Sequence, residues 1–331
     1  MTPRLLPLDL ERHGVRLALA AIALLIGVAG LVRLADPYES ADATLPEAAP
    51  PPGASVLIPP VVAPPASRPG SVVSAQRGPG IFDDGRTLVA YYGTAGTGAL
   101  GVLGESPPDA MHQRLRLAAK QFKRPGRPVR LVYELIVTVA DRTPGPDGSY
   151  SHDIDRADVR RYVEAARRNR ALLLLDIQPG HDDFLDVAKR WQWALEEPHV
   201  GLALDPEWRM RRAVPGTVIG SVTAHEVNRT ARWLSRLTQD HGLPEKLFVL
   251  HQFRTSMIER IHRIGPRPHL AMVQHVDGFG TPGQKLATYH AVARPGQFAM
   301  GFKLFYDEDV RRMGPAQVHR LRPPVRFVSF Q

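Results

Sequence analysis

Eight short apolar runs, separated by segments that carry helix signals, fill residues 86–331 and constrain the fold more than any other feature. The runs are rich in Leu, Val, Ile, Phe and Ala and are bounded by Gly or Pro, as is typical of strands buried on both faces. Strands that alternate with helices predict an α/β fold, here a closed (β/α)8 TIM-type barrel in which each of the first seven strands is followed by a helix. The predicted strands are Thr87–Tyr92, Val129–Val139, Ala171–Gln178, Val200–Asp205, Leu247–Gln252, His269–His275, Gln297–Tyr306 and Val325–Phe330.

The intervening segments predict the helices. Apolar residues recur at helical spacing within Asp153–Arg170 and again within residues 184–195 and 227–237. Thr223-Ala-His-Glu226 and Ser256-Met-Ile-Glu259 match the capping-box pattern, which predicts that a helix begins at each. An open doubly wound sheet is the alternative architecture. No Gly-x-Gly-x-x-Gly motif follows a strand, however, and eight strands favour closure.

The N-terminal region has the pattern of a membrane segment. Residues 15–32 are apolar except for Arg16, and Arg4 and Arg12 precede them. About 17 to 20 apolar residues suffice to span a bilayer, and preceding basic residues favour a cytoplasmic N-terminus. We therefore predict a cytoplasmic basic segment over 1–14 and a transmembrane signal anchor over 15–34. A cleavable signal peptide is the alternative, with Ala41-Asp42-Ala43 as a small-x-small site.

A proline-rich stretch follows the predicted anchor. Residues 36–85 hold 11 of the chain's 31 prolines, and such a composition cannot pack a core and favours extended conformations. We predict a disordered linker over 35–85 that holds a barrel domain, 86–331, away from a membrane. The expected location is a single-pass cell-membrane protein with its C-terminal domain outside the cytoplasm, or a secreted protein if the signal is cleaved.

Composition excludes several classes of partner and chemistry. The formal net charge is +9, but the arginines are spread over many predicted helices and form no compact basic stripe with interleaved aromatics. We therefore expect no nucleic-acid partner. The chain has no cysteine, which excludes disulfides, thiolate metal sites and a cysteine nucleophile.

The fourth predicted strand ends in the clearest candidate for chemistry. Asp205 and Glu207 stand at positions i and i+2, so in an extended strand they lie about 7 Å apart on one face. Active sites of such barrels lie at the C-terminal strand ends, and glycosidases use carboxyl pairs about 5 to 9.5 Å apart. Ion pairs with Arg209, Arg211 or Arg212 are the structural alternative.

Asp176, at the end of the third predicted strand, completes the predicted catalytic set with Glu207 and Asp205. Two carboxylates on neighbouring strands raise one pKa, which keeps that group protonated for acid work. Glu134 lies within the second strand, where a charge is costly unless it is paired, and Lys303 is its candidate partner. The predicted substrate-binding residues are Glu134, Lys303, Tyr91, Tyr92, Gln178, Trp208, His251, Gln252, Gln274, His275, Asp277 and Asp307.

Two other kinds of site are weighed against this one. His251, His275, Asp176 and Asp205 would suit a mixed histidine and carboxylate metal site, but no His-x-His or His-Glu-x-x-His spacing supports it. We therefore expect neither a metal nor another cofactor. A serine hydrolase is disfavoured because the sequence has no Gly-x-Ser-x-Gly elbow.

Two short segments resemble a known group of enzymes. Leu204-Asp205-Pro206-Glu207-Trp208 resembles the strand-four motif of chitinase-like glycoside hydrolases and the Asp-x-Glu motif of a lysozyme-like family, and residues 88–93 resemble the first strand of the chitinase-like group. The resemblance implies that Glu207 is the general acid and that Asp205 orients it or assists an acetamido group. The family motif has a further Asp where this chain has Ala203.

These observations predict a membrane-anchored, extracytoplasmic glycoside hydrolase-like barrel that acts on an envelope or extracellular polysaccharide. The alternative is a barrel that binds glycans or assists envelope assembly without catalysis, which the alanine at position 203 favours.

Overall fold

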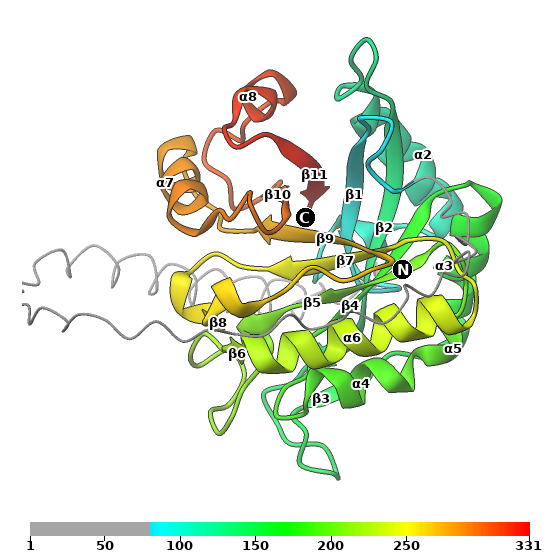
Figure 1. The fold of residues 1–331 in the computed structure, drawn as a ribbon, viewed down its shortest axis with the longest axis vertical. Helices are drawn as coiled ribbons and strands as arrows, with labels where there is room; N and C mark the ends of the chain where they lie inside the picture. The colour runs from blue at the N-terminus through cyan, green and yellow to red at the C-terminus, as the bar shows by residue number, and fades with distance from the viewer. Residues whose placement is uncertain (1–79) are drawn as a thin grey trace, which may run out of the picture. The chain divides into compact units, whose positions relative to one another are not determined.

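A computed structural model describes residues 80–331, and within them eight parallel strands close into a barrel of the TIM type (Figure 1). Closure is complete because β1 pairs in parallel with both β2 and β11. The predicted α/β class, the closed parallel barrel and its eight predicted strands are thereby confirmed. In order around the barrel the strands are β1 (Thr87–Gly93), β2 (Val129–Ala140), β4 (Leu172–Ile177), β5 (Val200–Leu204), β7 (Lys246–His251), β9 (Leu270–Val276), β10 (Ala299–Leu304) and β11 (Val325–Phe330).

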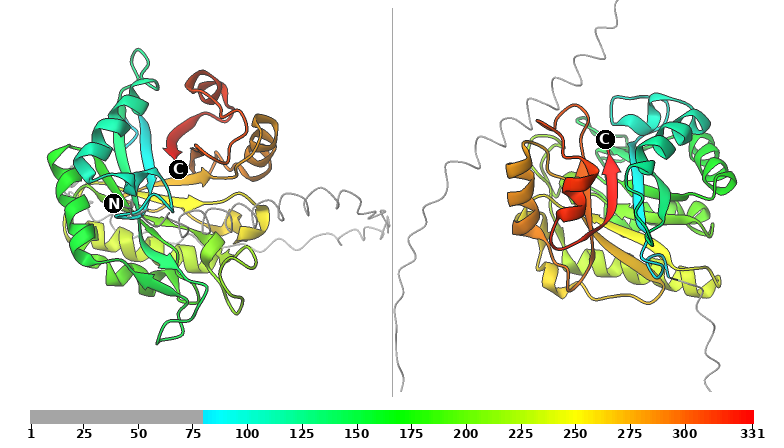
Figure 2. Two further views of the ribbon diagram at one scale, coloured as in Figure 1. Left: turned by 180° about the vertical axis from the view of Figure 1, so that it is seen from behind. Right: turned by 90° about the horizontal axis from the view of Figure 1, so that it is seen from above.

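The helices lie outside the ring of strands (Figure 2). They are α2 (Pro108–Lys120), α3 (Arg156–Arg168), α4 (Phe184–Arg190), α5 (Gln192–Leu195), α6 (Ala224–Asp240), α7 (Pro282–Val292) and α8 (Pro315–Arg320). Short elements complete the loops: β3 (Ser151–Asp153), β6 (Val222–Thr223), β8 (Ile258–Glu259) and the 3-10 turns η1 (Val102–Glu105), η2 (Pro206–Trp208), η3 (Thr255–Met257) and η4 (Ile261–Arg263). The predicted anchor and most of the predicted linker lie outside the described residues. Within residues 80–331, no helix combines the length and the apolar character that a membrane span requires.

The two predicted capping boxes have different outcomes. Thr223 caps α6 by accepting a hydrogen bond from the backbone N–H of Glu226, as predicted. The helix predicted from Ser256 is wrong, because this segment forms η3, β8 and η4 instead. Ile258 in β8 pairs with Val222 in β6, and Gly265-Pro266 follows too closely for a helix to develop. Among the first seven barrel strands, β7 is therefore the one that is not followed by an α-helix.

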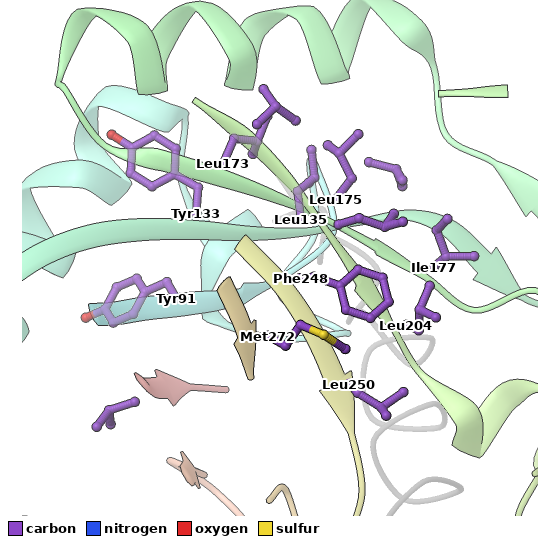
Figure 3. Packing of buried hydrophobic residues seen from close by; sticks show 14 of the residues in the cluster. Tyr91, Tyr133, Leu135, Leu173, Leu175, Ile177, Leu204, Phe248, Leu250 and Met272 are labelled. Atoms are coloured by element: carbon purple, nitrogen blue, oxygen red, sulfur yellow. The ribbon is translucent and has the colours of Figure 1, made fainter. Parts of the chain in front are cut away.

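The larger part of the core lies between the strands and the helices. Outward-facing side chains of the strands pack there beneath the helices, with Leu135, Leu173, Leu204, Phe248 and Met272 among them (Figure 3). Each of these strands is buried on both faces because its inward-facing side chains fill the barrel. Uninterrupted apolar runs are the expected sequence of such strands.

Apolar side chains fill the part of the barrel interior that lies before the C-terminal strand ends, which we call the lower half; the part at those ends is the upper half. The apolar side chains of the lower half are Leu88, Ala90, Val132, Leu172, Leu174, Ala203, Leu247, Val249, Ala271, Val273 and Phe327. Ile81, before the first strand, joins this cluster with only 5% of its surface exposed, and its backbone N–H donates to Glu245 Oε2 at 2.6 Å. Ile81, which lies within the stretch that the composition assigned to the linker, therefore packs against the barrel interior.

Candidate functional site

Polar side chains replace apolar ones on the inward face as the strands approach their C-terminal ends. These polar side chains line the barrel mouth. We define the mouth as the inward-facing residues Tyr92, Glu134, Asp176, Asp205, His251, His275, Asp277, Lys303 and Ser329. Each of them is 8% exposed or less. Because burying charge is costly unless it is paired or hydrogen-bonded, the partners of these groups determine what the mouth can do.

The Asp205–Glu207 pair has a different geometry from the predicted one. Strand β5 ends at Leu204, and Asp205 caps the 3-10 turn η2 by accepting a hydrogen bond from the Glu207 backbone N–H at 3.3 Å. The two residues therefore do not stand on one face of an extended strand, because the turn begins at Pro206. Asp205 is buried, whereas Glu207 and Trp208 are partly exposed.

A neighbouring loop holds this turn in place. The Gly220 backbone N–H donates to the Glu207 carbonyl at 2.7 Å, and a side chain at Gly220 would clash with the carbonyls of Pro206 and Glu207. Arg209 pairs with Glu226 at 2.9 Å, and Arg211 lies 3.7 Å from Glu259. The ion pairs that the sequence offered as an alternative for Glu207 are therefore not formed by these two arginines.

Glu134, His251 and Asp277 form a buried chain across the mouth. His251 Nδ1 lies 2.9 Å from Asp277 Oδ2, and its Nε2 lies 3.2 Å from Glu134 Oε1. The partner of Glu134 is therefore His251 on β7, and the predicted Lys303 pairing is not formed. Lys303 instead donates to Gln331 Oε1 at 3.1 Å and lies 3.9 Å from Asp277 Oδ2.

Asp176 is held from β1. The Tyr92 hydroxyl donates to Asp176 Oδ2 at 2.7 Å and accepts a hydrogen bond from Gln178 Nε2 at 3.3 Å. The Lys303 ammonium lies 3.5 Å from the centre of the Tyr92 ring, a cation–π contact. Four of the predicted site residues therefore lie in one network, namely Tyr92, Asp176, Gln178 and Lys303.

Sequence reasoning missed the partner of His275. His275 Nε2 lies 2.6 Å from Ser329 Oγ, and a side chain at Gly301 would approach His275 Nδ1 to 2.3 Å. Burial lowers the pKa of His275 well below its ordinary value, so its ring is neutral. A small polar residue at alternate spacing from Phe327 in an apolar strand is the signal that could have identified Ser329.

Several predicted substrate-binding residues lie away from the mouth. Tyr91 packs against Tyr306 and Phe330 in the outer core. Gln274 donates to Gln252 Oε1 at 2.6 Å and to the Val292 carbonyl, which ties β7 and β9 to the end of α7. Asp307 is exposed in the loop after β10. The structure gives these side chains no place beside the buried carboxyls.

The carboxyl groups of the mouth and the neighbouring Glu207 differ in the direction and size of their pKa shifts. Burial and the charge of Asp277 raise the pKa of Glu207 to about 7. Burial raises the pKa of Asp176 to about 6, and burial raises the pKa of Asp205 well above its ordinary value. Burial acts on Asp277 in the same direction, but the hydrogen bond and charge of His251 outweigh it and lower that pKa. Carboxyls separated in this way are suited to acid and base roles.

Three buried carboxylate oxygens lack a hydrogen-bond partner. Glu134 Oε2, Asp176 Oδ1 and Asp277 Oδ1 have no hydrogen-bond partner among the described residues. Leaving such a buried atom unpaired costs about 1–3 kcal/mol. A ligand that brings hydroxyl or amine donors would recover part of that free energy.

Possible metal ligands and a hollow in the described part of the chain can be compared with the mouth. Residues 80–331 contain no group of three or more His, Asp or Glu arranged to hold a metal ion. A hollow of about 690 Å³ lies elsewhere and is lined by Thr281, Pro282, Gly283, Arg311, Arg312 and Gln317. It includes none of the candidate site residues, so the buried carboxyls are the better guide to chemistry.

The fold and site together define a TIM-type parallel barrel whose mouth holds an acidic, hydrogen-bonded network. No protein-family model matches the chain, and no curated protein is significantly similar to it.

Proposed function

We propose that this protein is a glycoside hydrolase-like barrel that acts on an envelope or extracellular polysaccharide, with Glu207 as general acid. The observation that carries the proposal is the gathering of carboxyls at the C-terminal strand ends, with Asp277 held by His251 at 2.9 Å and Glu207 in the turn that follows β5. Burial raises the pKa of Glu207 to about 7, whereas the hydrogen bond and charge of His251 outweigh burial and lower the pKa of Asp277. Glycosidases use one carboxylic acid and one carboxylate in this way.

Each group has a specific role in this mechanism. Glu207 donates its proton to the oxygen of the scissile glycosidic bond as that bond breaks. Asp277 stabilises the positive charge that develops on the sugar in the transition state. A water molecule then adds its oxygen to the anomeric carbon and gives up a proton to a carboxylate, which completes the hydrolysis. Asp205, which the sequence suggested as a second catalytic carboxylate, is assigned instead to holding the Glu207 backbone through its hydrogen bond at 3.3 Å.

The remaining groups suit a hydroxylated ligand. The free oxygens of Asp176 and Glu134 are acceptors for sugar hydroxyls. Trp208, partly exposed beside Glu207, offers an aromatic face to a sugar ring. The proposal also includes the anchor over 15–34 and the linker over 35–85, which would hold the barrel outside the cytoplasm and near envelope polysaccharides.

The test compares full-length protein with a Glu207→Gln variant on purified envelope polysaccharides. We expect reducing-end release to fall by about 100- to 10,000-fold, because the amide has no proton to donate to the leaving oxygen. Glu164→Gln, on the exposed face of α3, is the matched control and should retain full activity. Unchanged release by the Glu207 variant would refute the assigned role.

A glycan-binding barrel without catalysis is the second candidate. One observation favours it: Ala203 replaces the further acid of the chitinase-like motif. Equilibrium binding to immobilised glycans distinguishes the two. Binding by both wild type and Glu207→Gln, with no product from either, would select this second function.

A further inference from the structure

We propose that His251 is a positioning residue: held between Glu134 and Asp277, it fixes the orientation and the charge of Asp277 and does not contact the substrate. The catalytic consequence rests on the proposed function, whereas the structural claim does not. The sequence alone placed His251 among the substrate-binding residues, so this assignment changes its role.

The geometry of His251 leaves it no free nitrogen. Nδ1 lies 2.9 Å from Asp277 Oδ2, Nε2 lies 3.2 Å from Glu134 Oε1, and the side chain has no exposed surface. As an ionised carboxylate Asp277 accepts hydrogen bonds and donates none, so Nδ1 carries a proton, and the second proton is assigned to Nε2, which faces Glu134. The ring is therefore an imidazolium that joins β2, β7 and the end of β9.

The surroundings of His251 favour this charged form. Burial alone lowers the pKa of His251, but hydrogen bonds to Asp277 and Glu134 outweigh it and raise that pKa well above the ordinary value. The titratable groups that face the ring or interact with its charge come from every neighbouring strand. They are Tyr92 (β1), Glu134 (β2), Asp176 (β4), Asp205 and Glu207 (after β5), His275 (β9), Asp277 (after β9) and Lys303 (β10).

The contact with His251 determines the orientation and the charge of Asp277. One of its oxygens is held by His251, so the other, Oδ1, is fixed and has no partner among the described residues. Lys303, at 3.9 Å, is a second and more distant cation. Removing the imidazolium leaves a buried carboxylate with only that weaker contact, and burial then favours the protonated form. His251 is thus what keeps Asp277 ionised in a buried site.

The first experiment is a titration that needs no turnover. Full-length protein with ¹³C-labelled aspartate carboxyls is titrated by NMR, and the Asp277 resonance is assigned by its loss in Asp277→Asn. In His251→Gln we expect the midpoint of Asp277 to rise by about one pH unit or more. Glu134→Gln, which leaves an uncharged acceptor for Nε2, should produce a smaller shift in the same direction.

The matched control is His275→Gln. His275 is an equally buried neighbour whose ring lies 5.1 Å from that of His251, but its pKa is lowered and it carries no charge. We expect this variant to leave the Asp277 midpoint nearly unchanged. An unmoved midpoint in a folded His251→Gln protein, or equal shifts in the His251 and His275 variants, would overturn the proposal.

A measurement on the wild type keeps the proposal falsifiable even if the variant does not fold. The ¹⁵N shifts of His251 should report two protonated nitrogens from pH 5 to 8, and a neutral ring at pH 7 would overturn the assignment. Failure of the proposed function is a separate outcome, namely no product from any glycan. If the protein is active, the acidic limb of the pH–rate profile should move upward in His251→Gln by the shift measured for Asp277.

Discussion

The lower and upper halves of the barrel interior are built from the same strands but follow opposite rules. In the lower half Leu88, Val132 and Phe327 meet in an apolar cluster closed by Ile81. Two to four residues further along the same strands, the inward positions are Tyr92, Glu134 and Ser329. The lower half contributes stability through apolar burial, whereas the upper half holds polar groups whose burial is costly.

The upper half of the barrel contains groups that lower the stability of the fold. Asp176 is buried, with a pKa raised to about 6 and one oxygen unpartnered. A structure optimised for stability alone would place an apolar side chain at this position. Costly features of this kind concentrate at functional sites, so the upper half is the place to look for function.

The largest expected change comes from the lower half. Leu88→Ala removes a fully buried side chain and should lower the free energy of unfolding by about 2–5 kcal/mol. Leu117→Ala, 64% exposed on α2, is the control and should change it by about 0.5 kcal/mol or less. Urea denaturation measures both. Similar losses in the two variants would contradict the view that the barrel interior is a packed core.

A smaller change is expected where the two halves meet. Gly301→Ala would bring a Cβ within 2.3 Å of His275 Nδ1, and the forced movement should cost about 1–3 kcal/mol of stability. Gly283→Ala, in α7 with no atom near the added carbon, should be neutral or stabilising by about 0.4–1 kcal/mol. Thermal unfolding compares them, and a stable Gly301 variant would show that the His275 pocket is loosely packed.

A change of similar size but opposite sign, a gain, is expected in the upper half. Asp176→Asn keeps an acceptor for Tyr92 and removes a buried charge. The raised pKa means that the wild type has no ionisation penalty below about pH 4 and the whole penalty above about pH 6. The variant should therefore gain about 1–3 kcal/mol over the wild type as pH rises through this window.

Urea unfolding at pH 4, 5, 6 and 7 tests whether the stability of the variant relative to the wild type rises with pH. Asp186→Asn, exposed on α4, is the matched control and should change stability by about 0.5 kcal/mol or less at every pH. An Asp176 variant whose relative stability fell with rising pH would mean that Asp176 is stabilised as a carboxylate.

Most of the fold could be predicted from local sequence. Apolar runs bounded by Gly and Pro located every barrel strand, because strands buried on both faces need no polar residue along most of their length. The same logic failed at Ser256, where a capping pattern met a segment too short for a helix. It also did not predict the burial of Ile81, because that burial depends on the assembled barrel.

The site was predictable as a set of strand ends but not as a geometry. Neighbours such as Tyr91 and Tyr92, or Gln274 and His275, differ only in the face on which they lie, and a one-residue step reverses the face. In a strand that is buried on both sides, hydrophobicity does not distinguish inward from outward. Tyr91 and Gln274 were consequently predicted to bind substrate together with residues that do line the mouth.

The sequence by itself determined the architecture and the chemical types gathered at the barrel mouth, because both follow from local patterns of polarity along each strand. Only the tertiary structure decided the pairings: His251 rather than Lys303 beside Glu134, Ser329 beside His275, and Asp277 beside His251. Those pairings join residues as far apart in the chain as Glu134 and His251. They depend on the register of strands around a closed barrel, which no local pattern encodes.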